Sequence, residues 1–228
     1  MAARSVFDII GPVMIGPSSS HTAGAARIGL FARAVLLDKP IKARIELYGS
    51  FAKTACGHGT DRAILGGLLG MIPADERIKE AKDIAEQEGL QFEFVPSAAR
   101  EKHPNTAGIH LTGAGGKRVY VEGCSIGGGE ILITRIDQYE LGIGGKKPTL
   151  LVEHENKPGM IGCVTSMLGD QNVNIASLHL TGSPAGRGYN LLVAECDEIV
   201  PEEVRQKMLK IPEITKISWI NPWKGEIR

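Results

Sequence analysis

The first half of the chain alternates hydrophobic segments with glycine-rich polar loops. Residues 41–48 alternate apolar and polar side chains, which predicts a half-buried strand. Apolar side chains at helical spacing predict one helix after residue 24 and a second helix from residue 60. A third helix is expected over residues 74–88, because proline and glycine at its two ends are typical start and stop signals. The apolar stripe of the first helix consists of Ala25, Ile28, Ala32, Val35 and Leu36.

Short strand patterns follow the third helix. They have no regular repeat, and a glycine-rich turn at residues 112–117 separates two of them. The first half is therefore expected to be a mixed α and β domain over residues 1–141. The predicted strands cover residues 92–95, 109–112, 119–122 and 131–136.

The second half follows a more regular pattern after a glycine-rich, basic stretch that ends in proline, residues 142–148. This composition is typical of a linker. The next domain, residues 149–221, is expected to have the order βαββαβ, a two-layer ferredoxin-like unit, and residues 222–228 form a tail. The whole chain is thus predicted to be an α+β protein. The predicted elements are strand 149–154, helix 159–169, strand 174–181, strand 189–196, helix 201–210 and strand 214–220.

Composition and charge exclude several classes of partner. The 228 residues carry 26 basic and 26 acidic side chains, so the formal charge is zero, and only 5% of the residues are aromatic. We therefore expect neither a nucleic-acid surface nor binding to an anionic membrane. Charges or glycines interrupt every long apolar stretch, and the start of the chain lacks the pattern of a signal peptide. A cytoplasmic location is expected.

The four cysteines are dispersed at positions 56, 124, 163 and 196, without the spacing of a zinc or iron–sulfur site. Cys163 and Cys196 lie in apolar segments, where small buried side chains are expected. Cys56 and Cys124 lie in glycine-rich loops beside polar motifs, so either a structural or a functional use is open for them. The sequence predicts no metal site in this chain.

A polar run at residues 16–24 stands immediately before the first predicted helix. It contains Ser18, Ser19, Ser20, His21 and Thr22. A helix N-terminus presents unpaired N–H groups and the positive end of the helix dipole, so it can hold a carboxylate or a phosphate. Ser and Thr also serve as ordinary N-caps, but a cap uses one side chain only. The surplus of hydroxyl groups favours binding of an anion or a substrate.

Two motifs mark the second half, Glu155-Asn156-Lys157-Pro158-Gly159 after its first strand and Asn172-Val173-Asn174-Ile175 at its second. With these motifs, residues 149–221 resemble an ACT domain, a small-molecule-sensing module of enzymes in amino-acid metabolism. The resemblance implies a ligand site or an interface at Asn156, Pro158, Gly159 and Asn174, because a glycine allows close approach of the backbone. Such domains also serve only as dimerisation sheets, and both uses remain open. Self-association through this domain is expected.

Four polar motifs follow one another in the first half. They are GPSSSHT at residues 16–22, YGS at 48–50 with CGHGTD at 56–61, HPN at 103–105 and SIGGG at 125–129. With these motifs the first half resembles the β portion of iron–sulfur-dependent L-serine dehydratases, which is also related to a regulatory domain of some phosphoglycerate dehydrogenases. In single-chain relatives a cluster-bearing α portion follows, whereas here an ACT-like domain follows, as in the two-subunit enzymes. The resemblance implies a β subunit that works with an α subunit.

The resemblance also implies a reaction. Water is eliminated from L-serine to give aminoacrylate, which yields pyruvate and ammonia, a lyase step in amino-acid degradation and gluconeogenesis. In these enzymes a [4Fe-4S] cluster acts as a Lewis acid on the substrate hydroxyl, and here the partner α subunit is expected to ligate it. A base must remove the α-proton, and the carboxylate must be held.

Candidate residues for these tasks come from the four motifs. The hydroxyls of Ser18, Ser19, Ser20 and Thr22 are candidates for binding the carboxylate. His58, between two glycines, is the first candidate for proton transfer or for a position near the cluster, with a structural loop histidine as the alternative. His21 is the second candidate for proton transfer.

The remaining candidates have structural alternatives of equal simplicity. Thr60 and Asp61 can bind substrate or orient His58. His103 and Asn105 fit a substrate contact or a turn, and Gly128 fits either a substrate contact through its backbone or a tight connection between strands.

Two other functions compete with that of a dehydratase subunit. One is a non-catalytic regulatory module that senses serine or another amino acid. The other is a detached regulatory part of a phosphoglycerate dehydrogenase, which has less support because no G-x-G-x-x-G fingerprint follows a strand. A neighbouring gene for a chain with cysteines spaced for a cluster would favour the dehydratase.

Overall fold

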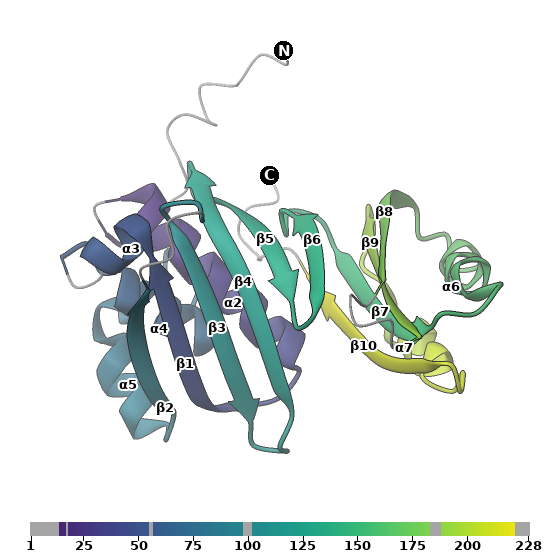
Figure 1. Ribbon diagram of the computed structural model, residues 1–228, viewed down its shortest axis with the longest axis horizontal. Helices are drawn as coiled ribbons and strands as arrows, with labels where there is room; N and C mark the ends of the chain where they lie inside the picture. The colour runs from purple at the N-terminus through teal and green to yellow at the C-terminus, as the bar shows by residue number, and fades with distance from the viewer. Residues whose placement is uncertain (1–13, 17, 55–56, 98–101, 183–187, 222–228) are drawn as a thin grey trace, which may run out of the picture. The chain divides into compact units, whose positions relative to one another are not determined.

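A computed structural model describes residues 14–16, 18–54, 57–97, 102–182 and 188–221. The chain forms two compact units, one within residues 1–137 and 142–144 and the other within residues 138–141 and 145–228. Each unit combines one sheet with helices (Figure 1). This arrangement confirms the predicted α+β class.

A six-stranded sheet has the order β2-β1-β3-β4-β5-β6, and the first unit contains its first five strands and the end of β6. β1 and β2 run parallel, and the pairs β1–β3, β3–β4 and β4–β5 are antiparallel. Every strand predicted for this half is present, but the pattern does not predict β6, which takes up the start of the glycine-rich stretch expected as a linker. The strands are β1 (Pro40–Tyr48), β2 (Gln91–Ser97), β3 (Thr106–Gly113), β4 (Arg118–Gly127), β5 (Glu130–Ile136) and β6 (Tyr139–Ile143).

Helices cover one face of this sheet, with α2 behind β3 and β4 in the view of Figure 1. All five residues of the predicted apolar stripe of α2 are buried, so the helical spacing located the core face correctly. Among the described residues, the connection from β1 to β2 contains four further helical elements, and a short one precedes α2. The helical elements are η1 (Ser19–Gly24), α2 (Ala25–Leu36), α3 (Gly49–Thr54), α4 (Thr60–Leu68), η2 (Glu76–Glu80) and α5 (Ala81–Gln87).

Helices α2 and α4 cross at two glycines, Gly29 and Gly67. A Cβ atom at Gly67 would lie 2.1 Å from the Ala26 carbonyl oxygen, and one at Gly29 would lie 2.4 Å from the Ile64 carbonyl oxygen. Only residues without a side chain allow the two backbones to approach so closely. This crossing fixes α4, and with it the loop before α4, against α2.

The single helix predicted over residues 74–88 consists of two pieces. Its first turn is the 3₁₀-helix η2, capped by Asp75, whose carboxylate accepts a hydrogen bond from the Arg77 N–H at 3.0 Å. The α-helical part, α5, begins only at Ala81, and Gly89 follows it with φ 77°. The predicted start was therefore early, because the carboxylate cap at position 75 sets the first turn.

The second unit has the predicted order βαββαβ, with a four-stranded sheet ordered β10-β7-β9-β8. Its core joins the inner face of the sheet to both helices, with fully buried side chains such as Leu150, Val164 and Met208. Within the described residues, no helix combines the length and the apolar character needed to cross a lipid bilayer. The elements are β7 (Thr149–Glu155), α6 (Met160–Gly169), β8 (Ile175–Gly182), β9 (Tyr189–Cys196), α7 (Glu202–Met208) and β10 (Ile214–Ile220).

Candidate active site

The serine run forms one π-helical turn, η1, that continues directly into α2, rather than a turn before an α-helix. Ser18 caps η1, and its Oγ accepts a hydrogen bond from the His21 N–H at 3.3 Å. One serine of the three is thus explained by capping. Ser19 and Ser20 are half-buried and have no side-chain hydrogen bond to another described residue. Short π-helical segments are rare and often mark functional sites.

His21 is held on both sides of its ring by hydroxyl groups. Its Nδ1 lies 3.2 Å from Ser18 Oγ, and its Nε2 lies 3.0 Å from Ser50 Oγ at the start of α3. Phe51 packs edge-on against the ring, with 5.4 Å between centroids. Burial, with a smaller effect of the charge of His58, lowers the pKa of His21. The ring is therefore fixed in orientation and favoured in its neutral form.

His58 lies beside His21, with 5.2 Å between the ring centroids. It stands in the turn between α3 and α4, where its backbone N–H donates to the Thr54 carbonyl at 3.0 Å. The residue is exposed, and its ring forms no hydrogen bond with any other described residue. The structure therefore brings the two candidates for proton transfer together and leaves one of them accessible.

A cavity of about 230 Å³ adjoins His58. Thr22 contributes to its wall, and the Oγ1 of this residue is buried without a hydrogen-bond partner among the described residues. Since a buried hydroxyl without a partner is costly, such an atom marks a place for a polar ligand or a water molecule. The lining consists of Ile15, Gly16, Thr22, Gly57, His58, Gly59, Arg62, Ile78 and Lys79.

Thr60 and Asp61 form no hydrogen bond with His58, so the structure does not support their orienting role. The Asp61 carboxylate instead pairs with Lys82 Nζ at 2.5 Å and accepts a hydrogen bond from the Arg62 N–H at 2.8 Å. The Thr60 hydroxyl is fully buried and has no partner in the described part of the chain. Asp61 thus joins α5 to the first turn of α4.

The loop with His103 and Asn105 is held by its own hydrogen bonds. The Asn105 N–H donates to His103 Nδ1 at 3.2 Å, and the Thr106 hydroxyl donates to the His103 carbonyl at 2.7 Å. These contacts account for the motif as a turn. The Asn105 Oδ1 is nevertheless buried without a partner among the described residues.

The same loop supports the candidate site indirectly through Pro104. The Pro104 carbonyl accepts hydrogen bonds from the N–H groups of Ser50 and Phe51, at 2.7 and 3.2 Å. These two residues contact the ring of His21. The His-Pro-Asn loop therefore positions α3, and α3 positions His21.

The glycine run at residues 127–129 forms the connection between β4 and β5. Gly127 pairs with Glu130, and Gly128 and Gly129 have φ of 60° and 79°. Two consecutive positive φ values are typical of a two-residue type I′ hairpin. The Gly129 carbonyl accepts a hydrogen bond from the Arg27 guanidinium of α2. A tight strand connection thus accounts for Gly128 without a ligand.

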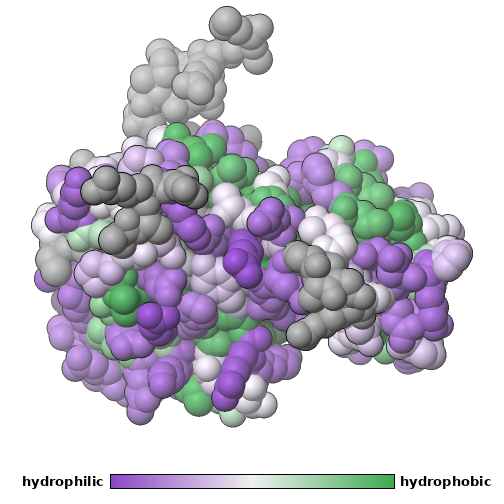
Figure 2. Space-filling view, in the orientation of Figure 1, coloured by the Kyte–Doolittle hydropathy of each residue, from purple (hydrophilic) through white to green (hydrophobic). Residues whose placement is uncertain are grey.

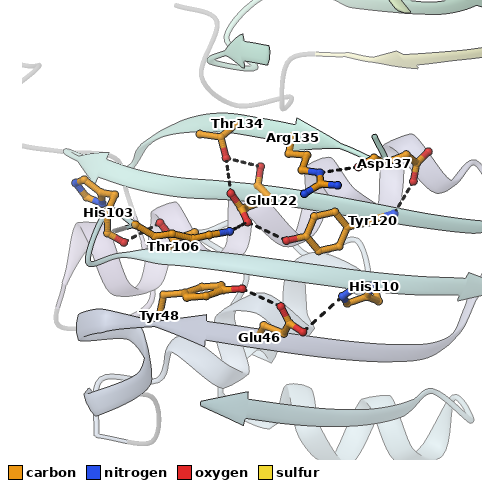
Figure 3. Close-up of polar contacts among 11 residues, drawn as sticks. Glu46, Tyr48, His103, Thr106, His110, Tyr120, Glu122, Thr134, Arg135 and Asp137 are labelled. Carbon is orange, nitrogen blue, oxygen red and sulfur yellow. Dashed lines mark hydrogen bonds and ion pairs between the residues drawn. The ribbon is translucent and has the colours of Figure 1, made fainter. Parts of the chain in front are cut away.

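The sheet face opposite α2 carries a network of polar side chains (Figure 3). Tyr48 donates a hydrogen bond to Glu46 at 2.8 Å, and His110 Nε2 lies 3.7 Å from the same carboxylate. Burial and the hydrogen bond to Glu46 raise the pKa of Tyr48 to about 12. Polar side chains prevail over this part of the surface (Figure 2).

Glu122 is the centre of the second half of this network. Its carboxylate accepts hydrogen bonds from Tyr120 at 2.8 Å and from Thr134 at 3.1 Å, and it pairs with Lys102. Burial alone acts to raise the pKa of Glu122, but these donors outweigh it and lower the pKa. The network is internally satisfied, so it stabilises this sheet face without requiring a ligand.

The candidate residues of the second unit each have a separate environment. Asn156 Oδ1 accepts a hydrogen bond from Asn190 Nδ2 at 3.1 Å, and Asn174 donates hydrogen bonds to two carboxylates of the loop after β9. Gly159 has φ 89° at the start of α6, and a Cβ atom there would have no neighbour within 4 Å. Pro158 and Gly159 are exposed, so the loop leaves room for a ligand or a neighbouring subunit.

The described residues do not fit a metal cluster. No three His, Cys, Asp or Glu side chains among them gather as ligands. Cys124 and Cys196 are buried, and burial raises the pKa of both thiols, that of Cys196 to about 11, whereas Cys163 is half-buried. Cys56 and its neighbour lie outside the described residues.

The structure adds three residues to the candidate site. Ser50 is part of the Tyr-Gly-Ser motif. The short spacing between this motif and the HGTD motif could have indicated that Ser50 lies near the candidate site. Arg62 follows that motif directly, whereas Lys79 stands in an ordinary helical pattern that offers no signal. The cavity that Arg62 and Lys79 share depends on the packing of η2 against α4, where Gly66 lies close to Ile78.

Comparison with protein-family models gives two matches. Residues 5–135 match the model described as serine dehydratase beta chain, and residues 148–213 match the ACT domain. The first match contains the cavity and both histidines of the candidate site.

Individual relatives extend these matches to nearly the whole chain. A protein of Bacillus subtilis named "Probable L-serine dehydratase, beta chain" is 44% identical over 96% of this chain and 99% of its own. The "L-serine dehydratase, beta chain" of Peptoniphilus asaccharolyticus is 36% identical with the same coverage. A D-3-phosphoglycerate dehydrogenase of Methanocaldococcus jannaschii is 30% identical over 70% of this chain but only 30% of its own.

Proposed function

Since this chain belongs to the serine dehydratase beta chain family and carries an ACT domain, we propose that it is the β subunit of a two-chain L-serine dehydratase. In the proposed reaction the Cα–H and Cβ–O bonds of L-serine break and water leaves. The resulting 2-aminoacrylate tautomerises to an imine, which water hydrolyses to pyruvate and ammonia. Two relatives named as beta chains, matched over nearly their full length, support this proposal.

The proposal includes an α subunit that carries a [4Fe-4S] cluster. The printed names of the relatives specify a beta chain, and among the described residues no three His, Cys, Asp or Glu side chains gather as metal ligands. The cluster belongs to the partner in this proposal, and the residues of this chain bind substrate and move protons. A reducing cytoplasm suits such a complex, and the three described cysteines are free thiols.

The observation that carries the proposal is the pairing of an engaged and an accessible histidine at one cavity. Both ring nitrogens of His21 face hydroxyl groups, whereas the ring of His58 is exposed and has no hydrogen bond within the described residues. A general base needs a nitrogen that can reach the substrate proton. We therefore assign abstraction of the α-proton to His58, and we assign the positioning of the His58 ring to His21.

The test is reconstitution with a candidate α chain whose cysteines are spaced for a cluster, followed by assay of pyruvate. His58→Ala is expected to lower kcat by about 10²- to 10⁴-fold, the usual contribution of a general base. Ser19→Ala or Ser20→Ala should mainly raise KM if these hydroxyls bind substrate and transition state equally. His110→Ala is a matched control, because it removes an exposed histidine from the opposite sheet face.

Assembly and cluster content must be measured for each variant, because a damaged interface also lowers kcat. Unchanged kcat for His58→Ala in an intact complex would transfer the catalytic role to His21 or to the partner. Absence of pyruvate with wild-type chains and a full cluster would refute the proposed function.

We further propose that the ACT domain makes the chain self-associate. β8 is an edge strand, and edge strands pair readily with another chain. Leu178 and Leu180 on β8 are 39% and 44% exposed, and hydrophobic side chains gather near β8 and α6 in Figure 2. Pairing of two such edges across a two-fold axis would bring the leucines of the two copies side by side on one face of the joined sheet.

A non-catalytic amino-acid-sensing module remains the second candidate, since phosphoglycerate dehydrogenases contain a related segment that makes up 23–30% of their length. The same reconstitution distinguishes the two. A sensing module would bind L-serine and change the activity of another protein, but it would not be required for pyruvate formation.

A further inference from the structure

The cavity beside His58 has a basic lining. His58, Arg62 and Lys79 all contribute to it, and no Asp or Glu does. Such a lining favours a ligand that presents an anionic group, such as a carboxylate, to the cavity.

Two neighbouring basic residues form structural ion pairs, whereas Arg62 and Lys79 do not. Arg77 pairs with Asp75 at 2.6 Å, and Lys82 pairs with Asp61 at 2.5 Å. Arg62 and Lys79 are both exposed, and neither forms an ion pair with a described carboxylate. The Arg62 guanidinium and the Lys79 ammonium group thus lie at one cavity without a carboxylate partner among the described residues.

Two features of the cavity wall also point to a polar ligand. Thr22 contributes to the wall and is 2% exposed, and its Oγ1 is buried without a hydrogen-bond partner among the described residues. The volume of about 230 Å³ is roughly eight times the share of one water molecule in the liquid, which leaves room for a small organic acid.

We propose that this cavity binds the carboxylate of a small amino-acid substrate, with Arg62 and Lys79 as its ionic partners and Thr22 Oγ1 as a hydrogen-bond donor. This assignment keeps Thr22 of the predicted serine loop and adds two basic residues that the sequence did not indicate. The identification of the substrate as L-serine rests on the proposed function, whereas the assignment of a carboxylate group to this site rests on the cavity itself. Exposed ion pairs are individually weak, so both basic residues are needed for the effect.

The experiment is a titration of the full-length chain, in which the ring signals of its six histidines are followed by NMR. The probes are L-serine, L-serinamide, which lacks the carboxylate, and L-lactate, which lacks the ammonium group. L-serine and L-lactate are expected to shift the His58 signal, and L-serinamide is not. Binding should weaken as salt rises, because the ionic partners are exposed.

The decisive variant is Arg62→Gln/Lys79→Gln, which is expected to weaken L-serine binding at least tenfold. The matched control is Lys117→Gln/Arg118→Gln, which removes two exposed basic residues that do not line the cavity and should leave binding unchanged. Backbone amide spectra establish that each variant is folded.

Several results would overturn the inference: equal affinity of the double variant and the wild type, equal affinity for L-serine and L-serinamide, or no response of His58 to millimolar L-serine. Pyruvate formation by the reconstituted complex is measured separately. If it fails while carboxylates still bind at His58, the proposed function is wrong and the cavity assignment stands.

Discussion

Replacing Gly67 by alanine is expected to destabilise the first unit by about 2 kcal/mol, although alanine favours helices more than glycine does. The new Cβ atom would lie 2.1 Å from the Ala26 carbonyl oxygen and 2.7 Å from the Leu30 nitrogen, both backbone atoms that cannot rotate away. To reach even 3.0 Å, α4 must withdraw from α2 by about 0.9 Å. Gaps of ~0.5–1 Å already remove a quarter to a half of the dispersion energy between packed atoms.

The magnitude follows from two opposing contributions. Overpacking at a site without slack costs up to ~3 kcal/mol, and the better helix propensity of alanine returns at most ~1 kcal/mol. The net loss of about 2 kcal/mol corresponds to a roughly 30-fold rise in the opening equilibrium. Since α4 follows directly after His58, activity in the complex should fall as well, because a displacement near 1 Å can cost ~10²-fold in rate.

Amide hydrogen exchange resolved by peptide is the appropriate assay, because it reports on each unit separately. Protection in α2 and α4 should fall about 30-fold, while α6 is unaffected. Two glycines provide graded controls. At Gly66 a Cβ atom meets the flexible Ile78 Cγ1 at 2.9 Å, so a smaller loss is expected, and at Gly162 in α6 it meets no atom within 4 Å.

Gly162→Ala should therefore stabilise its own helix by up to ~1 kcal/mol. If Gly67→Ala gives the same protection as wild type in α2 and α4, the helices are not in contact at these glycines and the account of the crossing is wrong.

Three further predictions concern the site and assembly. The pKa of His21 is lowered below its ordinary 6.5, so the unfolded chain takes up a proton at this residue before the folded chain does. The free energy of unfolding should therefore fall as the pH drops below about 6.5. In urea denaturation between about pH 7.5 and pH 5.5, His21→Gln should reduce this pH dependence. Retention of the full pH dependence by the variant would contradict the shift. The purified chain alone should be colourless and form no pyruvate, and an iron–sulfur absorption band with serine-dependent activity would contradict this. Leu178→Glu/Leu180→Glu should convert the self-associated chain to a monomer in light scattering, and an unchanged mass would exclude this edge as the interface.

The hydrophobic pattern was sufficient for most of the fold because each strand or helix of the core buries a periodic set of side chains. The stripe of α2 and the six elements of the ACT domain are examples. β6 was missed because its short segment, with Gly142 and Gly144 at its end, has the composition of a linker. The split between η2 and α5 depends on a cap at Asp75, which periodicity does not detect.

The candidate site was predicted in part. The motifs identified His21, His58 and Thr22, which the fold brings to one place, but not the environment that distinguishes the two histidines. That difference depends on Ser50, which a turn far along the chain positions through Pro104. Arg62 and Lys79 were missed because their common feature is the absence of a carboxylate partner, which only the packed structure reveals.

The π-helical turn η1 has an implication for changes in chain length. A π-helical turn accommodates one residue more than an α-helical turn over the same rise, so the polar run carries a residue that an ordinary helix would not need. Deleting one residue, such as Ser19 or Ser20, would allow the turn to close as an α-helix without disturbing the packing of α2. Each residue of an α-helix turns the chain by about 100°, so everything before the deletion would rotate away from His21. Homologous loops are therefore expected to vary in residue type more readily than in length.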